Sequence, residues 1–287
     1  MTNIKDIAIT TDSTCDLPQE LIEENEITVI PLTVLLGDSV YRDGVDIKPA
    51  DIYAYVDKTG ELPKTSAVTP AEYYEVFKKL VDDGKNVVHI GFSSGLSSSF
   101  QNASVASSEL DDVYCVDSKT LCTAQGLLVL KACDFRAKGL DVKKIADKVT
   151  KLVPKVSATF VLDGLEYLHK GGRCSTVARF GANVLGIKPS IAVDNQTGKL
   201  EVAKKYRGKT DIVYKQYITD RMNEIKRIEP DRVVIAESGG VSPKTLAFAK
   251  GVIEGKDKFN QVIVTDAGCT ISSHCGPKTL AIFYIKK

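Results

Sequence analysis

The sequence predicts an α/β protein of two domains. The N-terminal one is a three-layer α/β domain with a mostly parallel sheet, and the C-terminal one is an α/β domain with a mixed or antiparallel sheet. The 287 residues, 43% of them hydrophobic, suffice for two domains with a sizeable core. In the first half, short apolar segments alternate with amphipathic ones, as in parallel sheets covered by helices. In the second half, Asn195-Gln196-Thr197-Gly198 separates two strand-like segments and indicates a hairpin.

The first half contains the expected strands and helices of the parallel domain. Apolar segments predict strands at residues 4–10, 27–36, 86–92 and 113–116. Helical spacing and cap signals predict helices at residues 17–24, 49–57, 70–83, 97–108, 121–137 and 141–152. Asp16 is the expected cap of the first helix, and Thr69-Pro70-Ala71-Glu72 forms a capping box before the third. We place the domain boundary near Pro154, giving domains of residues 1–154 and 155–287.

The second half has a different pattern. Strands are expected at residues 157–162, 189–193, 200–205, 232–236, 261–265 and 280–285, and helices from about residue 175 and at 211–225 and 243–253. A glycine pair at residues 171–172 indicates a turn, and His274 is expected in a loop before the final strand.

Composition excludes several classes of function. Lys and Arg number 38 and Asp and Glu 37, a balance that gives no argument for nucleic acid or an anionic membrane as partner. No apolar run reaches about 18 residues, so no transmembrane segment is predicted. The seven cysteines lack C-x-x-C spacing, which argues against zinc and favours a reducing cytoplasm. Nucleotide-binding and kinase signatures are absent from the sequence.

The densest chemical signal is a serine-rich segment, residues 91–108, between a predicted strand and helix. Ser97 and Ser98 lie where a helix N-terminus offers free N–H groups to a carboxylate or phosphate. The plainer interpretation is that one of them caps the helix. A serine hydrolase with Ser97 as nucleophile and His274 as base is a further alternative, although G-x-S-x-G is missing. A protein that binds a small phosphorylated metabolite is another alternative.

Other polar residues lie on predicted loops. Thr65 and Ser66 precede a well-capped helix, and as hydroxyl groups on a loop they can face a shared ligand. Arg173 and Arg207 occur in glycine-containing segments, where arginine can bind a carboxylate or phosphate in bidentate fashion. For each of these residues alone, ordinary surface solvation is the competing interpretation. Two further polar residues have structural interpretations: His89 as a buried strand residue, and Asp12 as a hydrogen-bond acceptor for its turn.

Several segments carry a family resemblance when they are taken in order. They are Thr11-Asp12-Ser13-Thr14-Cys15-Asp16-Leu17, Val29-Ile30-Pro31-Leu32, Thr65-Ser66, Ser93-Ser94-Gly95-Leu96-Ser97, Lys170-Gly171-Gly172-Arg173, Ile187-Lys188-Pro189 and Ile271-Ser272-Ser273-His274. Together these segments span nearly the whole chain. In their order and spacing they resemble the DegV family of bacterial fatty-acid-binding proteins. The chain departs from the family pattern after the serine loop and after His274, where Ser98-Ser99 and Cys275-Gly276-Pro277 stand.

The resemblance implies a long-chain fatty acid, such as palmitate or oleate, in a tunnel between the two domains. It also implies that the protein presents this ligand to a separate fatty acid kinase, is not itself an enzyme, and needs no cofactor or metal. Carried over to this chain, Thr65 and Ser97 would bind the carboxylate. Supporting contacts to the carboxylate or phosphate are expected from Ser66, Ser98, Arg173, Arg207 and His274.

Overall fold

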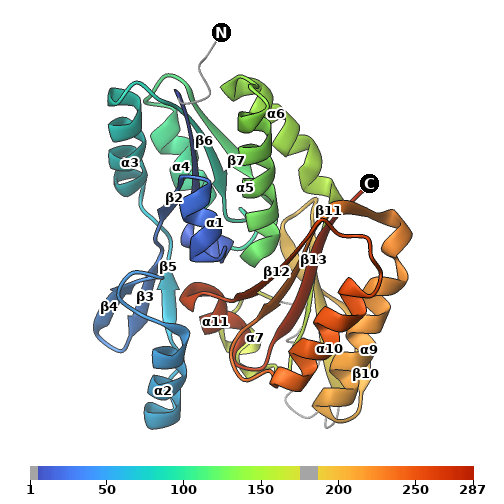
Figure 1. The fold of residues 1–287 in the computed structure, drawn as a ribbon. Helices are drawn as coiled ribbons and strands as arrows, with labels where there is room; N and C mark the ends of the chain where they lie inside the picture. Colours follow the sequence, from blue (N-terminus) through green and yellow to red (C-terminus); the bar gives the residue numbers. More distant parts are fainter. Residues whose placement is uncertain (1–5, 175–186) are drawn as a thin grey trace.

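A computed structural model of the chain describes residues 6–174 and 187–287, and within them it contains three β-sheets (Figure 1). A parallel sheet lies in the N-terminal part and a mixed sheet in the C-terminal part, which confirms the predicted α/β class. A third, small sheet was not predicted. The boundary placed near Pro154 stays a prediction, although the strands of the two large sheets lie on opposite sides of it in the sequence.

The N-terminal sheet has the strand order β2-β1-β6-β7, and all neighbours are parallel. Its strands are β1 (Ile7–Asp12), β2 (Ile27–Ile30), β6 (Asn86–Gly91) and β7 (Val113–Asp117). Helices α3 (Pro70–Asp82) and α4 (Ser99–Ser107) pack on one face, and α5 (Cys122–Ala137) and α6 (Val142–Leu152) on the other. The predicted capping box before α3 is confirmed, since the Thr69 hydroxyl accepts a hydrogen bond from the Glu72 amide.

The predicted strand at residues 27–36 is wrong as a single element, because Pro31 and Leu32 divide it. The first part is β2, and the second is β3 (Thr33–Leu36), which belongs to the small sheet. That sheet is antiparallel with the order β4-β3-β5, and contains β4 (Ser39–Arg42) and β5 (Lys64–Ser66) beside helix α2 (Pro49–Thr59). Proline cannot donate to a β-ladder, which favours a change of sheet at this point.

The predicted capping role of Asp16 is also wrong. Asp16 has a φ of +45° at the end of the short 3₁₀ helix η2 (Ser13–Cys15), and α1 (Gln19–Glu24) begins only after Pro18. Proline disfavours helical backbone at the residue before it, so the helix cannot start at Leu17. The Asp16 carboxyl group is instead buried.

The C-terminal sheet is mixed, with the order β10-β9-β8-β13-β11-β12. Among the described strands of this sheet, only the β11–β12 pair is parallel. The strands are β8 (Val156–Val161), β9 (Ile187–Asp194), β10 (Lys199–Arg207), β11 (Ile228–Glu237), β12 (Gln261–Asp266) and β13 (Leu280–Lys286). Between β8 and β13 in sequence lie α9 (Thr210–Asn223) and α10 (Pro243–Glu254), and the 3₁₀ helices are η3 (Val153–Lys155) and η4 (Ile225–Arg227).

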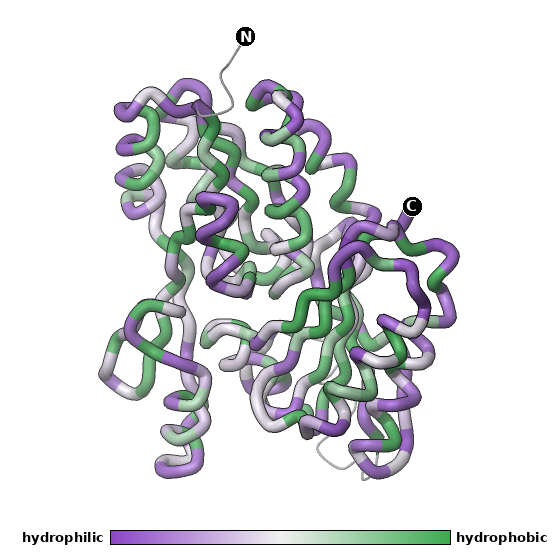
Figure 2. Tube along the Cα trace, viewed as in Figure 1, coloured by the Kyte–Doolittle hydropathy of each residue, from purple (hydrophilic) through white to green (hydrophobic). Residues whose placement is uncertain are grey.

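Helix α5 joins the two halves of the molecule. It contacts β1 and β6 of the parallel sheet and also β8, β11 and β13 of the mixed sheet. Eleven of its 16 residues are buried, as expected for a helix covered on more than one side. Figure 2 shows hydrophobic residues concentrated in this helix and in the strands of both large sheets. One continuous core therefore runs from one sheet to the other.

Two short helices were missed. Helix α7 (Glu166–Lys170) contains His169, and α11 (Cys269–Cys275) contains His274. The expected loop at His274 is therefore wrong, whereas the turn expected at residues 171–172 follows α7 directly. Both helices are short, and the small polar residues of α11 give no apolar periodicity by which to recognise it. The helix predicted from about residue 175 lies outside the described residues.

Candidate functional site

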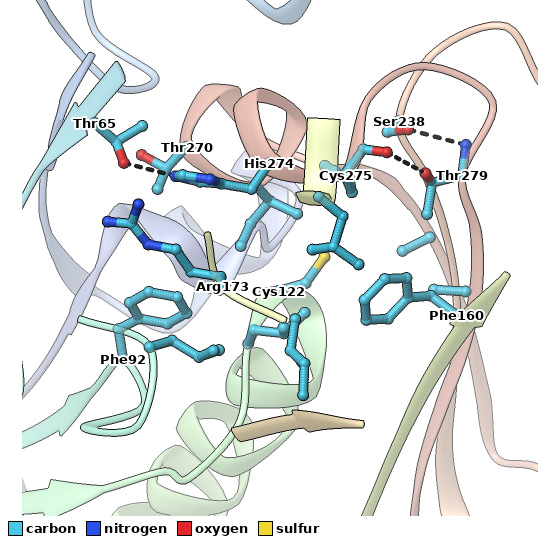
Figure 3. A pocket seen from close by; sticks show the side chains of 18 of the residues that line it. Thr65, Phe92, Cys122, Phe160, Arg173, Ser238, Thr270, His274, Cys275 and Thr279 are labelled. Atoms are coloured by element: carbon cyan, nitrogen blue, oxygen red, sulfur yellow. Dashed lines mark hydrogen bonds between the residues drawn. The ribbon is translucent and has the colours of Figure 1, made fainter. Parts of the chain in front are cut away.

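A cavity lies between the N-terminal and C-terminal parts of the molecule (Figure 3). The space between its walls amounts to about 790 Å³, including its opening to solvent. Five of the predicted site residues line it, although they come from distant parts of the sequence: Thr65, Ser66, Ser97, Arg173 and His274. Most of the other lining side chains are apolar, among them Leu32, Phe92, Leu96, Leu121, Phe160, Leu168, Leu200, Ile271 and Phe283.

Several of the polar lining residues lie at one end of this cavity, which we call its polar end, whereas Ser238 and Thr279 lie on the side of Phe160. Figure 3 shows Thr65, Thr270, His274 and Arg173 on one side and Phe160 on the other. Thr65 lies on β5 of the small sheet, and its Oγ1 is 2.8 Å from Nε2 of His274. Arg173 is exposed and donates from Nη1 to the carbonyl of Gly171 at 2.7 Å. The cavity thus has a polar end with hydroxyl and imidazole groups, and the rest of its lining is mostly apolar, with Glu237, Ser238 and Thr279 as further polar residues.

The imidazole of His274 is neutral at physiological pH. Burial lowers its pKa to about 4, and the nearby Arg173 charge acts in the same direction. The ring also lies close to the backbone, because a Cβ on Gly171 would approach Nδ1 of His274 to 2.6 Å. Glycine at position 171 therefore lets α7 pack directly against the histidine ring.

Ser97 lies on the loop between β6 and α4, and its hydroxyl contacts the start of the helix. Its Oγ accepts from the Ser99 amide at 3.1 Å and lies 3.0 Å from the Ser99 hydroxyl. The expectation that a serine here caps the helix is thus partly met by Ser97. Ser98 occupies the N-cap position but makes no capping hydrogen bond through its side chain.

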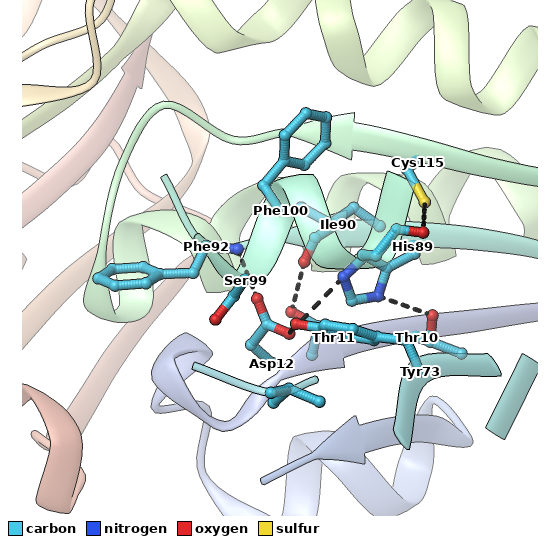
Figure 4. Close-up of polar contacts among 12 residues, drawn as sticks. Thr10, Thr11, Asp12, Tyr73, His89, Ile90, Phe92, Ser99, Phe100 and Cys115 are labelled. Atoms are coloured by element: carbon cyan, nitrogen blue, oxygen red, sulfur yellow. Dashed lines mark hydrogen bonds and ion pairs between the residues drawn. The ribbon is translucent and has the colours of Figure 1, made fainter. Parts of the chain in front are cut away.

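A buried polar cluster holds the start of this loop in place (Figure 4). Asp12, at the end of β1, accepts hydrogen bonds from the Phe92 amide at 2.6 Å and from the Tyr73 hydroxyl at 2.5 Å. His89 is buried next to it, with Nδ1 3.1 Å from the Thr10 hydroxyl. Asp12 therefore anchors the loop as well as its own strand end, and His89 is a buried strand residue as predicted.

Two of the predicted supporting residues lie away from the cavity walls. Arg207 is the last residue of β10 and is exposed, and Ser98 is exposed as well. Neither belongs to the set of residues that line the cavity. Contacts from these two residues to a ligand remain a prediction.

Five polar lining residues were not recognised from the sequence: Cys122, Glu237, Ser238, Thr270 and Thr279. Thr270 and Cys122 are buried, and Glu237 is half-buried at the end of β11. Burial raises the pKa of Glu237, and the negative charge of Asp266 adds to this shift. The only sequence signal for Thr270 was its position four residues before His274. This spacing places the two residues on the same face of a helix, but only once α11 is known to be one.

The described residues offer no group of three or more His, Cys, Asp or Glu side chains that could hold a metal ion. Over the same parts of the chain, no helix is long and apolar enough to cross a membrane. All seven cysteines are free thiols, and six of them are buried.

Solved structures with the same architecture include fatty-acid-binding proteins. A DegV family protein from Thermus thermophilus, described as binding fatty acid, superposes with a TM-score of 0.89 and 26% identity over 98% of this chain and 100% of that one. A stearic acid-binding protein from Eubacterium ventriosum has a TM-score of 0.83 and 28% identity, with 98% of each chain covered. DegV of Bacillus subtilis, described as a fatty acid binding protein, has a TM-score of 0.81 and 28% identity over 98% and 99%.

Sequence comparison gives the same grouping. A DegV domain-containing protein of Clostridium acetobutylicum is 33% identical over 285 residues, which cover 98% of this chain and 99% of the relative. The family model described as "uncharacterised protein, DegV family" matches residues 6–287. The chain therefore belongs to the DegV family.

Proposed function

We propose that this protein binds a long-chain fatty acid, such as palmitate or oleate, in the cavity between its two halves. The carboxylate lies at the polar end, where Thr65 and Ser97 donate hydrogen bonds to it, and the tail runs toward Phe160. The observation that carries the proposal is a single, mostly apolar cavity that is also lined by the hydroxyl groups of Thr65 and Ser97. The fatty-acid-binding relatives of the same fold support it.

The physical chemistry of the cavity suits an amphipathic chain. Each methylene group transferred from water to apolar surroundings contributes about 0.8 kcal/mol, so a tail of many methylenes can dominate the affinity. A carboxylate taken out of water needs hydrogen-bond donors to offset its desolvation. The hydroxyl groups of Thr65 and Ser97 can supply such donors, and the exposed Arg173 adds a positive charge at the cavity.

The role of the bound fatty acid is the second part of the proposal. We propose that the protein presents the carboxylate to a separate fatty acid kinase in the cytoplasm and supplies no catalytic group of its own. The nucleotide-binding signatures of a kinase are missing from the sequence, so ATP would have to come with a partner. Arg173 and Arg207 are exposed cations that can contact the carboxylate, the new phosphate or the partner.

The geometry favours binding over the alternative of a serine hydrolase. Ser97 Oγ has Ser99 as its hydrogen-bond partner, and Nε2 of His274 has Thr65. A nucleophile and its base need a direct hydrogen bond between them. The mostly apolar cavity likewise favours an acyl chain over a small phosphorylated metabolite.

Extraction of the purified protein and mass spectrometry of the extract test the proposal. We expect a fatty acid of about 16 to 18 carbons, and a rise in melting temperature when palmitate or oleate is added to stripped protein. A protein without acyl chains and without any thermal shift would overturn the proposal. Covalent labelling of Ser97 by a fluorophosphonate probe would favour the hydrolase instead.

A further inference from the structure

The second threonine at the polar end of the cavity, Thr270, has no assigned role. Its side chain is 2% exposed, and among the described residues its Oγ1 has no hydrogen-bond partner. It nevertheless lines the cavity. A buried hydroxyl without a partner is unfavourable, and most buried polar groups in proteins are paired.

We propose that Thr270 is a third ligand of the head group, and that its hydroxyl donates a hydrogen bond to the carboxylate of the bound fatty acid. The inference rests on the proposed function and extends it by one binding residue. Figure 3 shows the Thr270 side chain on the same side of the cavity as Thr65 and His274. A ligand that reaches this end would supply the partner that Thr270 lacks.

The helix that carries Thr270 places it next to the other polar groups. Thr270 and His274 are four residues apart on α11 and therefore share a face of that helix. The same face meets β5, because Nε2 of His274 lies 2.8 Å from the hydroxyl of Thr65. Thr65, Thr270 and His274 thus line the same part of the cavity (Figure 3), and Ser97 is a further lining residue.

A contact between distant parts of the chain fixes the start of this helix. Its N-cap residue, Gly268, has no side chain, and the Asp43 carboxylate accepts hydrogen bonds from the Cys269 amide at 2.8 Å and the Thr270 amide at 3.2 Å. Asp43 lies in the small-sheet region and also accepts from the Ser13 hydroxyl at 2.9 Å. The backbone of Thr270 is thus held in place in the ligand-free protein.

The substitution Thr270→Val tests the inference because it replaces the hydroxyl with a methyl group of similar size. We expect the affinity for palmitate to fall about tenfold, by the loss of a hydrogen bond to a charged group. The melting temperature of the ligand-free variant should stay the same or rise, since an unpartnered hydroxyl has been removed. A merely structural role would lower stability and affinity together.

Two further variants complete the experiment. Thr270→Ser keeps a hydroxyl group and should retain most of the affinity. Thr10→Val removes a buried threonine hydroxyl that is bonded to His89, away from the cavity walls. It should lower the melting temperature of the ligand-free protein and leave the affinity for palmitate within about twofold.

The outcomes separate this inference from the proposed function. If the wild-type protein binds palmitate and Thr270→Val binds it equally well or more tightly, the inference is wrong while the proposed function stands. The same conclusion follows if Thr270→Ser loses as much affinity as Thr270→Val. If the wild-type protein binds neither palmitate nor oleate, the proposed function fails and the inference fails with it.

Discussion

At the scale of single residues, the polar end of the cavity depends on hydroxyl groups from different parts of the chain. Thr65 comes from β5 and Ser97 from the loop before α4, and Thr65 is in turn in contact with His274 of α11. Such a set can recognise a carboxylate without a buried positive charge. The ligand's negative charge is then offset by hydrogen bonds and by the exposed Arg173.

The double substitution Thr65→Ala with Ser97→Ala should weaken fatty-acid binding strongly. Two hydrogen bonds to a charged group are lost, each contributing about 1.5–3 kcal/mol. Titration of stripped protein with palmitate measures the effect, and Ser108→Ala serves as a control, because Ser108 is exposed and does not line the cavity. Unchanged affinity of the double variant would contradict the assignment of the carboxylate site.

The stability of the protein should depend on pH through His274. Its pKa is lowered to about 4 by burial in the folded state, so between pH 6.5 and pH 4 the unfolded chain binds more protons than the folded one. The free energy of unfolding should therefore fall as the pH drops through this range. The contribution of one such histidine is at most about 1.4 kcal/mol per pH unit.

Denaturant unfolding of the wild-type protein and of His274→Gln at several pH values measures this contribution. Burial lowers the pKa of His89 as well, so the variant keeps part of the slope and loses the part that belongs to His274. Equal slopes for the two proteins would show that His274 titrates normally in the folded state.

Sequence reasoning identified several residues that line the cavity, but it also named two that lie outside and missed others. Thr65, Ser66, Ser97, Arg173 and His274 do line one cavity, whereas Ser98 and Arg207 lie outside its walls. Thr270 was missed because a threonine in an unrecognised helix carries no signal of its own. The direction in which Thr270 points depends on α11, and this helix is too short to be recognised in the sequence.

At the scale of elements, α11 is the part of the site that depends most on long-range contacts. The Asp43 carboxylate accepts hydrogen bonds from the first amides of this helix. In most helices such amides are capped by a side chain that is close to them in the sequence. The small sheet therefore contributes Thr65 to the cavity and also stabilises the helix that carries Thr270 and His274.

Asp43→Ala should destabilise the protein and also weaken fatty-acid binding. Loss of a cap commonly costs about 0.5–2 kcal/mol of stability, and here the freed helix carries two groups of the polar end. Thermal unfolding and palmitate titration measure the two effects. Asp141→Ala is the matched control, because Asp141 caps α6 through the Lys144 amide at 2.9 Å and does not line the cavity. An equal loss of affinity in both variants would contradict the special role of Asp43.

The long elements were predictable and the short ones were not. Helix α3 was recognised by its capping box, and α5 was predicted at residues 121–137 from its helical spacing, because both features are local. The division of residues 27–36 into β2 and β3 depends on which sheet each half joins, and this is a tertiary choice. The small sheet was missed for the same reason.

At the scale of the whole molecule, the cavity exists because two sheets share one core. Helix α5 lies between them, and charged pairs reinforce the contact, with Arg232 on β11 bonded to Asp134 on α5 at 2.6 Å. Lys131 of α5 similarly meets Asp231 at 2.7 Å. The two halves are thus held together, and residues from both of them line the cavity.

The alternation of strands and helices predicted two sheets, and the hairpin signature predicted that the second is mixed. The cavity between them was implied by the family resemblance alone, because composition does not separate side chains that fill a core from side chains that line a cavity. Phe160 and Phe283 look like ordinary strand residues in the sequence, and only the fold places them at the cavity.

A crystal structure of the protein with palmitate tests the central claim most directly. We expect the carboxylate within hydrogen-bond distance of the Thr65 and Ser97 hydroxyls and the tail in the apolar part of the cavity toward Phe160. A chain bound in the reverse direction, with its carboxylate remote from both hydroxyl groups, or a cavity that stays empty at saturating palmitate, would contradict the account.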